Sequence, residues 1–258
     1  MEEAVIYSVK DGIAVITMNR PKSLNSMNGD LIEGLHAALD KAESDPQVRA
    51  AVLTGSGKAF CAGGDLSYLN SLEAPADKKA FIARVGGVAY RITTIGKPFI
   101  AWVNGVAAGA GVNLMLACDL VYASVKARFA ESFAKVGLIP DCGGLYLLPK
   151  AVGLLKAKEL MFTADLIDAG EAYRLGMLNH VCEEGELEKK VMEMAARLAA
   201  SAPLSIAMTK KYLNNTALTL EEVLAVEETA QALLMGTEDC KEGIAAFYGK
   251  RSPEFKGR

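Results

Sequence analysis

The sequence predicts an α/β fold in which a core of strands and helices is followed by a helical C-terminal section. Strand-like and helix-like segments alternate over the first two thirds of the 258 residues, and helical patterns fill nearly everything after about Leu154. No period typical of a solenoid stands out. Hydrophobic residues make up 51% of the chain and charged residues 23%, which is enough apolar material for one large domain.

The first predicted elements are a hairpin and a helix. Two alternating runs flank Asp11-Gly12, a pair typical of a tight hairpin turn. Apolar residues then recur at helical spacing within residues 28–45. This apolar face consists of Leu31, Ile32, Leu35 and Leu39. The run 48–57 begins as a short buried strand and ends in a Gly/Ser loop.

The middle of the chain continues the alternation. Residues 77–98 predict a second amphipathic helix, and "FIAWV" after it predicts a buried strand. The apolar stripe of that helix consists of Phe81, Ile82, Val85, Val88 and Ile92. A Gly/Ala-rich loop that feeds a helix follows, then two short strands. Three helical segments are predicted near the C-terminus, at 186–201, 203–215 and 220–235.

Composition excludes several classes of function. The net charge of −3 gives no basic face for nucleic acid. The five cysteines are odd in number and no two stand at zinc-site spacing, and there are only two histidines, so we expect neither disulfides nor a metal site. The N-terminus is acidic and alternating, and no apolar run reaches the ~18 residues of a membrane span. A reducing, cytoplasmic location without membrane contact is expected.

Two glycine-rich loops are candidates for chemistry. "GSGKAFCAGGDL" (55–66) and "NGVAAGAGVNL" (104–114) each follow a strand. Small residues allow close approach to the backbone, and helix N-termini offer unpaired N–H groups. Two such loops side by side could aim two N–H donors at one oxygen, which is an oxyanion hole. Neither loop fits a P-loop or a dinucleotide fingerprint, and tight packing of a helix on a sheet is the simpler alternative.

Five motifs in a fixed order carry a resemblance to a known family. They are "MNRPKSLNSMN", "AFCAGGDL", the stretch 97–124, "GLIPDCGG" and the tail "EGIAAFYGKRSPEF". Along nearly its whole length the chain resembles the crotonase, or enoyl-CoA hydratase/isomerase, superfamily. The resemblance implies a spiral of β-β-α units, which we assign to residues 1–195. It also implies a helical C-terminal oligomerisation section, residues 196–258, that forms a homotrimer or a dimer of trimers.

The resemblance also implies a substrate and its binding residues. The substrate would be an acyl-CoA thioester, so coenzyme A belongs to the substrate and no separate cofactor is needed. The oxyanion donors would be the N–H groups of Ala62 and Ala110. The residues along CoA would be Lys22 and Leu24 at the nucleotide, Gly63, Gly64 and Asp65 at the pantetheine, and Phe247 and Lys250 reaching a neighbouring subunit's CoA. From residue type alone, the two lysines would be solvated surface charges.

The chain departs from the hydratase pattern at two positions. Hydration needs one carboxylate to activate water and another to supply a proton. The resemblance places the two glutamates of a hydratase at Asn113 and Phe133, and neither side chain exchanges protons at neutral pH. Glu131 is close in sequence, but a displacement of two residues re-aims a side chain. Efficient hydration is therefore not expected.

Asp141, in "GLIPDCGG", is the remaining acid. It could cap the following helix. Alternatively, its apolar surroundings would raise its pKa above about 3.9 and make it a proton shuttle near neutral pH. The run resembles the branch of ring-epoxyphenylacetyl-CoA isomerases and cis-3/trans-2-enoyl-CoA isomerases, which implies an acid/base role. We therefore predict an isomerase in which Asp141 moves a proton while Ala62 and Ala110 hold the enolate.

Three alternatives remain. The chain could be a weak hydratase that uses Asp141 and water, or a CoA-binding scaffold without activity. The resemblance also includes halobenzoyl-CoA dehalogenases, in which an aspartate at the position of Asp141 attacks an aromatic ring. Those enzymes carry a tryptophan where this chain has Phe133, whereas Trp102 lies in a predicted core strand. His36 borders the apolar face of the first helix and is expected to pack there.

Overall fold

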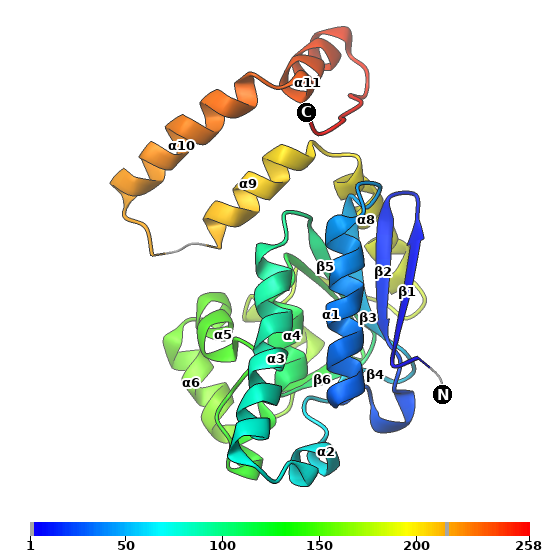
Figure 1. Ribbon diagram of the computed structural model, residues 1–258, viewed down its shortest axis with the longest axis vertical. Coiled ribbons are helices and arrows are strands. Elements are labelled where there is room, and N and C mark those ends of the chain that lie inside the picture. Colours follow the sequence, from blue (N-terminus) through cyan, green and yellow to red (C-terminus); the bar gives the residue numbers. More distant parts are fainter. Residues whose placement is uncertain (1–2, 215–216) are drawn as a thin grey trace.

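The computed structural model describes residues 3–214 and 217–258, and it contains two β-sheets surrounded by helices (Figure 1). The larger sheet has the strand order β1-β2-β3-β5-β7-β10, and the smaller one β4-β6-β8-β9. The strands are β1 (Val5–Lys10), β2 (Ile13–Met18), β3 (Ala50–Gly55), β4 (Ala59–Cys61), β5 (Phe99–Val103), β6 (Val106–Ala108), β7 (Leu120–Ser124), β8 (Arg128–Ala130), β9 (Ile167–Asp168) and β10 (His180–Cys182). The pairs β1–β2 and β8–β9 are antiparallel, and the remaining pairs are parallel.

Successive strands alternate between the two sheets. The strands β3, β5 and β7 lie in the larger sheet, and β4, β6 and β8, which follow them in turn, lie in the smaller one. The helices α3 (Pro75–Thr94) and α4 (Ala110–Leu116) return the chain to the larger sheet. This repetition of strand, strand and helix is the predicted spiral of β-β-α units, so the predicted fold class is confirmed.

The N-terminal hairpin and first helix form as predicted. Lys10 pairs with Ile13, and Asp11 and Gly12 between them have positive φ angles of 52° and 75°, as a tight hairpin turn requires. Helix α1 (Gly29–Ser44) begins after Asn28, whose side chain accepts the Leu31 N–H. The whole predicted apolar face of α1 is buried. Each such side chain contributes about 1.5–3 kcal/mol through burial.

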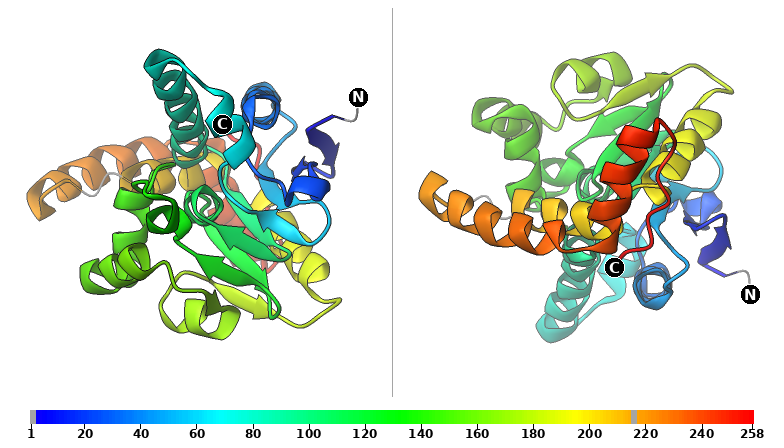
Figure 2. Two further views of the ribbon diagram at one scale, coloured as in Figure 1. Left: turned by 90° about the horizontal axis from the view of Figure 1, so that it is seen from below. Right: turned by 90° about the horizontal axis from the view of Figure 1, so that it is seen from above.

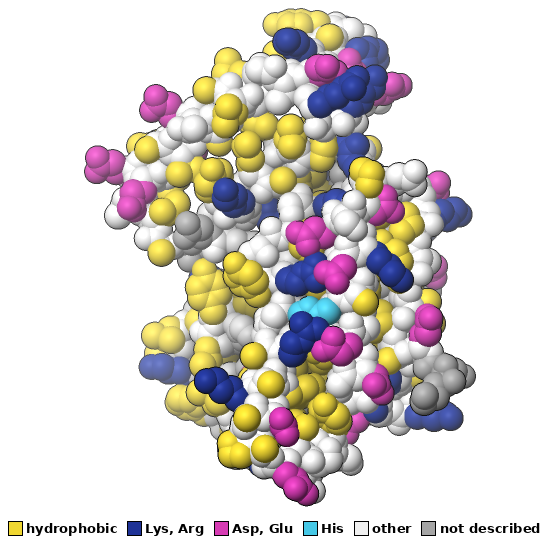
Figure 3. Space-filling model, viewed as in Figure 1, with side chains coloured by type: hydrophobic (Ala, Val, Ile, Leu, Met, Phe, Trp, Pro, Cys, Tyr) yellow, Lys and Arg dark blue, Asp and Glu magenta, His cyan; other side chains and the backbone are white. Residues whose placement is uncertain are grey.

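Helix α3 follows its predicted stripe with one exception. Phe81, Val85, Val88 and Ile92 are buried, whereas Ile82 is 39% exposed and lines a cavity. The adjoining face of α1 and α3 carries ion pairs around a histidine, which Figure 3 shows as a row of basic and acidic side chains. These pairs join Arg84 to Glu33 and Arg91 to Asp40 and Glu43. His36 packs at this seam, and its Nε2 lies 3.0 Å from the Arg84 carbonyl oxygen.

The sequence did not reveal the second sheet. Its strands β4, β6 and β9 have only two or three residues each, too few for a period of two to be visible, and the same holds for β10 in the larger sheet. Apart from β9 and β10, the described chain beyond Leu154 is helical or without strands, as expected. His180 begins β10.

The larger sheet is covered on both faces. One face packs against the main core with α1, α3 and α4. The other face carries Ile13, Val52 and Ile100, which pack against Val191 and Ala195 of α8 (Leu187–Ala199), and Trp102 joins this second cluster. The remaining helices near the core are α2 (Leu66–Ser71), α5 (Gly144–Val152), α6 (Leu154–Thr163) and α7 (Ala169–Arg174), with 3-10 turns η1 (Pro21–Ser23) and η2 (Ser132–Val136).

The last three helices extend away from the core (Figures 1 and 2). They are α9 (Pro203–Leu213), α10 (Leu220–Met235) and α11 (Glu238–Gly249). Helix α10 buries none of its residues and exposes large apolar side chains, among them Leu220, Leu224 and Leu233. Figure 3 shows hydrophobic side chains over this region. The division of the chain at residue 195 and the trimer stay predictions.

Four residues of the predicted segments lie outside the described residues: Met1 and Glu2 of the core section, and Asn215 and Thr216 of the C-terminal section, the former also in the predicted helix 203–215. Within the described ranges no single helix is long and apolar enough to cross a membrane, and only α8 with α9, a pair bent by 106°, reaches that length. All five cysteines are free thiols.

Candidate active site

A cavity of about 700 Å³ lies where the two glycine-rich loops meet the loop before α5. It is lined by residues 62–67, by Gly109 and Ala110, by part of η2 and by Asp141. Its remaining wall combines apolar side chains, including Ile82 and Phe133, with Lys78, Lys135 and two serines, Ser23 and Ser26. Its size and its few convergent polar groups are typical of a small-molecule site.

In the first loop the N–H group without a partner belongs to Gly64. Ala62 N–H donates to the Leu24 carbonyl over 3.0 Å, and Asp65 N–H donates to the Met27 carbonyl over 2.9 Å. Gly63 N–H is directed at the Cys61 sulfur. Gly64 N–H has no acceptor among the described residues. The prediction of Ala62 as an oxyanion donor was therefore wrong, because its N–H already serves the contact between this loop and the η1 segment.

In the second loop the free donor is Ala110. Gly109, with φ 51°, donates its N–H to Ala130 over 2.8 Å and precedes the first residue of α4. Ala110 N–H opens the helix and has no acceptor among the described residues, as the start of a helix dictates. The cavity therefore receives one free N–H from each loop, Gly64 and Ala110.

Two glycines allow the loops to touch. A side-chain carbon at Gly63, where φ is 89°, would lie 2.7 Å from the Ala108 carbonyl oxygen and 3.5 Å from the Ala110 nitrogen. A side-chain carbon at Gly111 would lie 2.1 Å from the Cys61 carbonyl oxygen. Both contacts involve backbone atoms that cannot swing away. Glycine at 63 and 111 is thus what brings the two donors together.

Asp141 faces the same cavity. Its Oδ1 is buried and has no hydrogen-bond partner, and burial raises the pKa of its carboxyl group to about 6. Its carbonyl oxygen accepts from Gly144 N–H and from Asn113 Nδ2, each over 2.9 Å. It is not a helix cap, because Gly143 occupies the N-cap position of α5 and no side chain caps that helix. A carboxyl group with a pKa near 6 can accept a proton at neutral pH and return it.

Of the two positions that depart from the hydratase pattern, Phe133 lines the cavity and Asn113 does not. Asn113 is fully buried in α4 and holds the loop of Asp141 through its amide nitrogen. Phe133 is buried and presents a hydrocarbon surface to the cavity. Neither can exchange a proton with the substrate.

Glu131 is buried behind this wall. It is 3% exposed, and neither of its carboxyl oxygens has a hydrogen-bond partner. Burial, and then the charge of Asp141, raise its pKa to about 8. The nearby Asn113 amide opposes this rise, and its nitrogen also donates to the Asp141 carbonyl. Because Glu131 lies two residues before Phe133, the sequence predicts that it does not take the place of Phe133. The residues that line the cavity do not include Glu131.

The remaining predicted residues are distributed around the chain. Gly63, Gly64 and Asp65 line the cavity, and Asp65 also pairs with Arg20 over 3.0 Å and caps α2. Lys22 and Leu24 lie in or beside η1, next to the cavity residue Ser23. Phe247 and Lys250 are exposed at the end of α11. Figure 1 shows α11 at the opposite end of the molecule from β4, β6 and α4, where the cavity loops lie. A CoA role for the last two stays a prediction that needs a neighbouring subunit.

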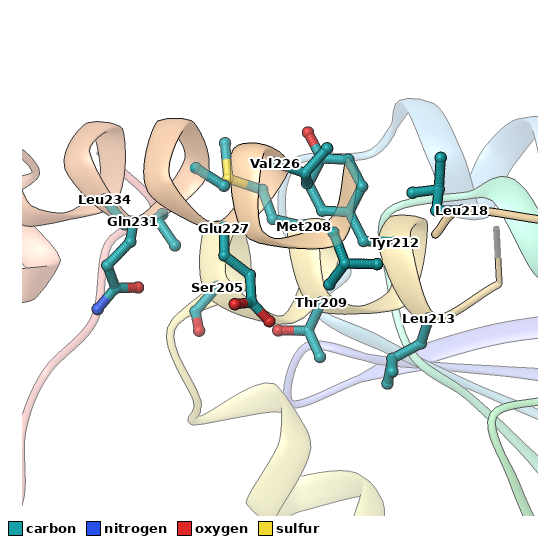
Figure 4. A pocket seen from close by; sticks show the side chains of 12 residues that line it. Ser205, Met208, Thr209, Tyr212, Leu213, Leu218, Val226, Glu227, Gln231 and Leu234 are labelled. Carbon is teal, nitrogen blue, oxygen red and sulfur yellow. The ribbon is translucent and has the colours of Figure 1, made fainter. Parts of the chain in front are cut away.

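A second cavity, of about 610 Å³, lies between α9 and α10 (Figure 4). Its ionisable side chains among the described residues are Glu227 and Tyr212, and its other lining residues are mostly apolar. It has no pair of free backbone donors opposite an acid. Nor do the described residues contain a cluster of three or more His, Cys, Asp or Glu that could hold a metal ion.

The fold and the site together define a crotonase-fold enzyme that handles acyl-CoA. Solved structures with this architecture include an enoyl-CoA hydratase from Bacillus anthracis, with a TM-score of 0.95, 31% identity and coverage of 99% of this chain and all of that one. An enoyl-CoA hydratase from Polaromonas sp. JS666 superposes with a TM-score of 0.94, at 35% identity and coverage of 97% of this chain and 99% of that one.

Sequence comparison gives the family. The enoyl-CoA hydratase/isomerase family model matches residues 8–258, and the chain belongs to this family. It is 37% identical to the 1,2-epoxyphenylacetyl-CoA isomerase of Escherichia coli, with all of both chains covered. It is 35% identical to the crotonyl-CoA hydratase of Syntrophomonas wolfei, with 98% of each covered. The suspected family and branch are confirmed, while isomerase and hydratase names both occur among the relatives.

Proposed function

We propose that this enzyme isomerises a 3-enoyl-CoA, or a ring-epoxide phenylacetyl-CoA type substrate, by a proton shuttle through Asp141. The observation that carries the proposal is the Asp141 carboxyl group, which has a raised pKa and a buried Oδ1 without a hydrogen-bond partner, in the cavity that receives two free N–H groups. The other carboxylate at this cavity, Asp65, is already paired with Arg20.

Each step uses a group of this chain. The N–H groups of Gly64 and Ala110 bind the thioester oxygen and stabilise the negative charge that develops on it. Asp141 removes a proton from C2, which gives a dienolate, and returns a proton to C4. The C3–C4 double bond is thereby replaced by one between C2 and C3, with no net change in atoms or electrons. A placed base contributes ~10²–10⁴-fold and one oxyanion donor ~10²–10³-fold.

Hydration is the second candidate, because several relatives carry hydratase names. It needs a second carboxyl group in the cavity, and Asn113 and Phe133 stand where the resemblance places those groups. We therefore propose that crotonyl-CoA hydration is much slower than 3-hexenoyl-CoA isomerisation by the same preparation. A non-catalytic scaffold is the third candidate, and it would bind acyl-CoA esters without turnover of either substrate.

Asp141→Asn is the test. The amide keeps the size of the side chain but cannot take a proton, so isomerisation falls ~10²–10⁴-fold. Binding of an unreactive acyl-CoA, measured by calorimetry, stays nearly unchanged. Isomerisation at the wild-type rate would remove Asp141 from the mechanism.

We also propose that the substrate's CoA runs past Lys22, Leu24, Gly63 and Asp65, and that the enzyme is a homotrimer or a dimer of trimers. The fully unburied helix α10 and the apolar groove beside it support an assembly. Sedimentation measures the assembly, and Lys250→Ala tests whether the tail of one subunit reaches the CoA of another.

A further inference from the structure

Glu131 is a buried acid for which the proposed shuttle has no use. Its side chain is 3% exposed, neither carboxyl oxygen has a donor within hydrogen-bond distance, and it makes no ion pair with any described residue. An ionised carboxylate in such a place would cost several kcal/mol, so the neutral acid is the favoured form. A neutral carboxyl group carries one O–H donor.

The Asn113 side-chain amide contains an unpaired buried acceptor. This amide lies close enough for its N–H group to lower the pKa of Glu131, and its Oδ1 is buried without a donor. Its Nδ2 donates over 2.9 Å to the carbonyl oxygen of Asp141. Asn113 therefore lacks one donor on its oxygen, and a protonated Glu131 has one to give. The resulting chain runs from Glu131 through Asn113 to the backbone of the catalytic loop.

Resting on the proposed proton shuttle, we propose that Glu131 is a positioning residue. As a protonated acid it donates to Asn113 and so fixes the loop that carries Asp141. When Glu131 ionises at alkaline pH, kcat/KM falls. The ionised form would lose the donor and place a second negative charge behind the enolate site.

The surrounding groups set the order of ionisation. Among the described residues, the titratable groups that act on Glu131, or on which it acts, are Asp141 and Cys142. Burial holds the pKa of the Cys142 thiol well above its ordinary value, so it stays neutral. Asp141 ionises with a pKa of about 6 and Glu131 with a pKa of about 8. Activity is then greatest between these values, where Asp141 is a base and Glu131 an acid.

The test compares the dependence of kcat/KM on pH for the wild type, Glu131→Gln and Glu131→Met. The Glu131→Gln variant keeps an N–H donor and cannot ionise. Its kcat/KM still rises with pH near pH 6, and its kcat at pH 7 is within about twofold of the wild type. The decrease of kcat/KM near pH 8 is lost. The methionine has no donor, and kcat falls about tenfold or more at pH 7 with KM little changed, as expected for an acid/base displaced from its position. The matched control Glu159→Gln, at an exposed glutamate paired with Lys156, leaves the profile unchanged.

A Glu131→Gln profile that superposes on that of the wild type up to pH 10 would overturn the proposal. A second readout does not depend on turnover. The infrared difference between wild type and Glu131→Gln at pH 7 shows the band of a protonated carboxylic acid, which disappears as the pH passes about 8. Absence of that band at pH 7 overturns the proposal whatever the activity. A different outcome separates this proposal from the proton shuttle. If Asp141→Asn is fully active while the infrared band of protonated Glu131 is present, Glu131 is a buried neutral acid, but the shuttle through Asp141 and the positioning role of Glu131 are both refuted.

Discussion

The two walls of the cavity are built in different ways. The donor wall (Gly63, Gly64, Gly109 and Ala110) is made of backbone: its N–H groups are placed by helix geometry and by close contacts that only glycine permits. The acid wall is made of side chains, with Phe133 and Asp141 at the cavity and Asn113 and Glu131 buried behind them, and it contains buried oxygens without partners. The binding of a thioester oxygen thus depends on backbone geometry, whereas the choice of reaction depends on the identity of a few side chains.

Gly63→Ala gives the largest effect expected at the donor wall. The added carbon would press on the Ala108 carbonyl and disturb the spacing of the two N–H groups, so kcat falls ~10²–10³-fold, as for the loss of one oxyanion donor. The matched control is Gly185→Ala, which has a similar φ of 86° and open space around it. The control costs about 1–2 kcal/mol of stability and no activity. Equal activity of the two variants would contradict the contact between the loops.

This difference between the walls also explains what sequence could predict. Helices α1 and α3, the hairpin, Ala110 and the placement of Asp141 at the cavity followed from periodicity, turn residues and motifs. The resemblance implied Ala62 and not Gly64; both are small residues, and nothing in the local sequence shows which N–H group is free. The choice depends on Met27, which pairs with Gly64 across the loops and leaves the Gly64 N–H free. Such a long-range contact has no signal in one sequence.

The same limit applies to the acid wall. The short strands β4 and β6, which lead into the two loops, were too brief to recognise. The burial of Glu131 depends on packing between β8, α4 and the loop of Asp141, and not on its neighbours in sequence. The residue type alone predicted that Asn113 and Phe133 cannot act as acid or base, because this property depends on the side chain and not on its position in the fold.

Stability should depend on pH through the acid wall. The pKa of Glu131 rises from 4.5 to about 8 on folding, so its neutral form favours the folded state below pH 4.5, and that advantage is lost as the pH rises toward 8. Glu131→Gln, which cannot ionise, should gain a few kcal/mol relative to the wild type at pH 8.5 and little at pH 4.5. Urea unfolding at both pH values measures the difference. A constant difference at the two pH values would contradict a buried ionisable Glu131.

Asn113→Leu should have a smaller effect. It removes the amide that donates to the Asp141 carbonyl and leaves that oxygen without one of its two donors, at a cost of about 1–3 kcal/mol. We expect kcat to fall about tenfold, with unchanged affinity for an unreactive acyl-CoA. Wild-type kcat would mean that Asn113 does not hold the catalytic loop.

The smallest effect is expected far from both walls. Glu33→Gln breaks an exposed ion pair with Arg84 on the α1–α3 face, and such pairs contribute about 0–1 kcal/mol. Thermal unfolding should shift by a few degrees at most, with unchanged kinetics. A loss of activity here would show that the site depends on more than its two walls.

The most direct test of the single-carboxyl shuttle follows the proton itself. With 3-hexenoyl-CoA deuterated at C2, in ordinary water, the account predicts a 2-enoyl product from the wild type that carries part of the deuterium at C4, and no product above background from Asp141→Asn. A product whose C4 hydrogen comes entirely from water, formed equally fast by Asp141→Asn, would contradict it.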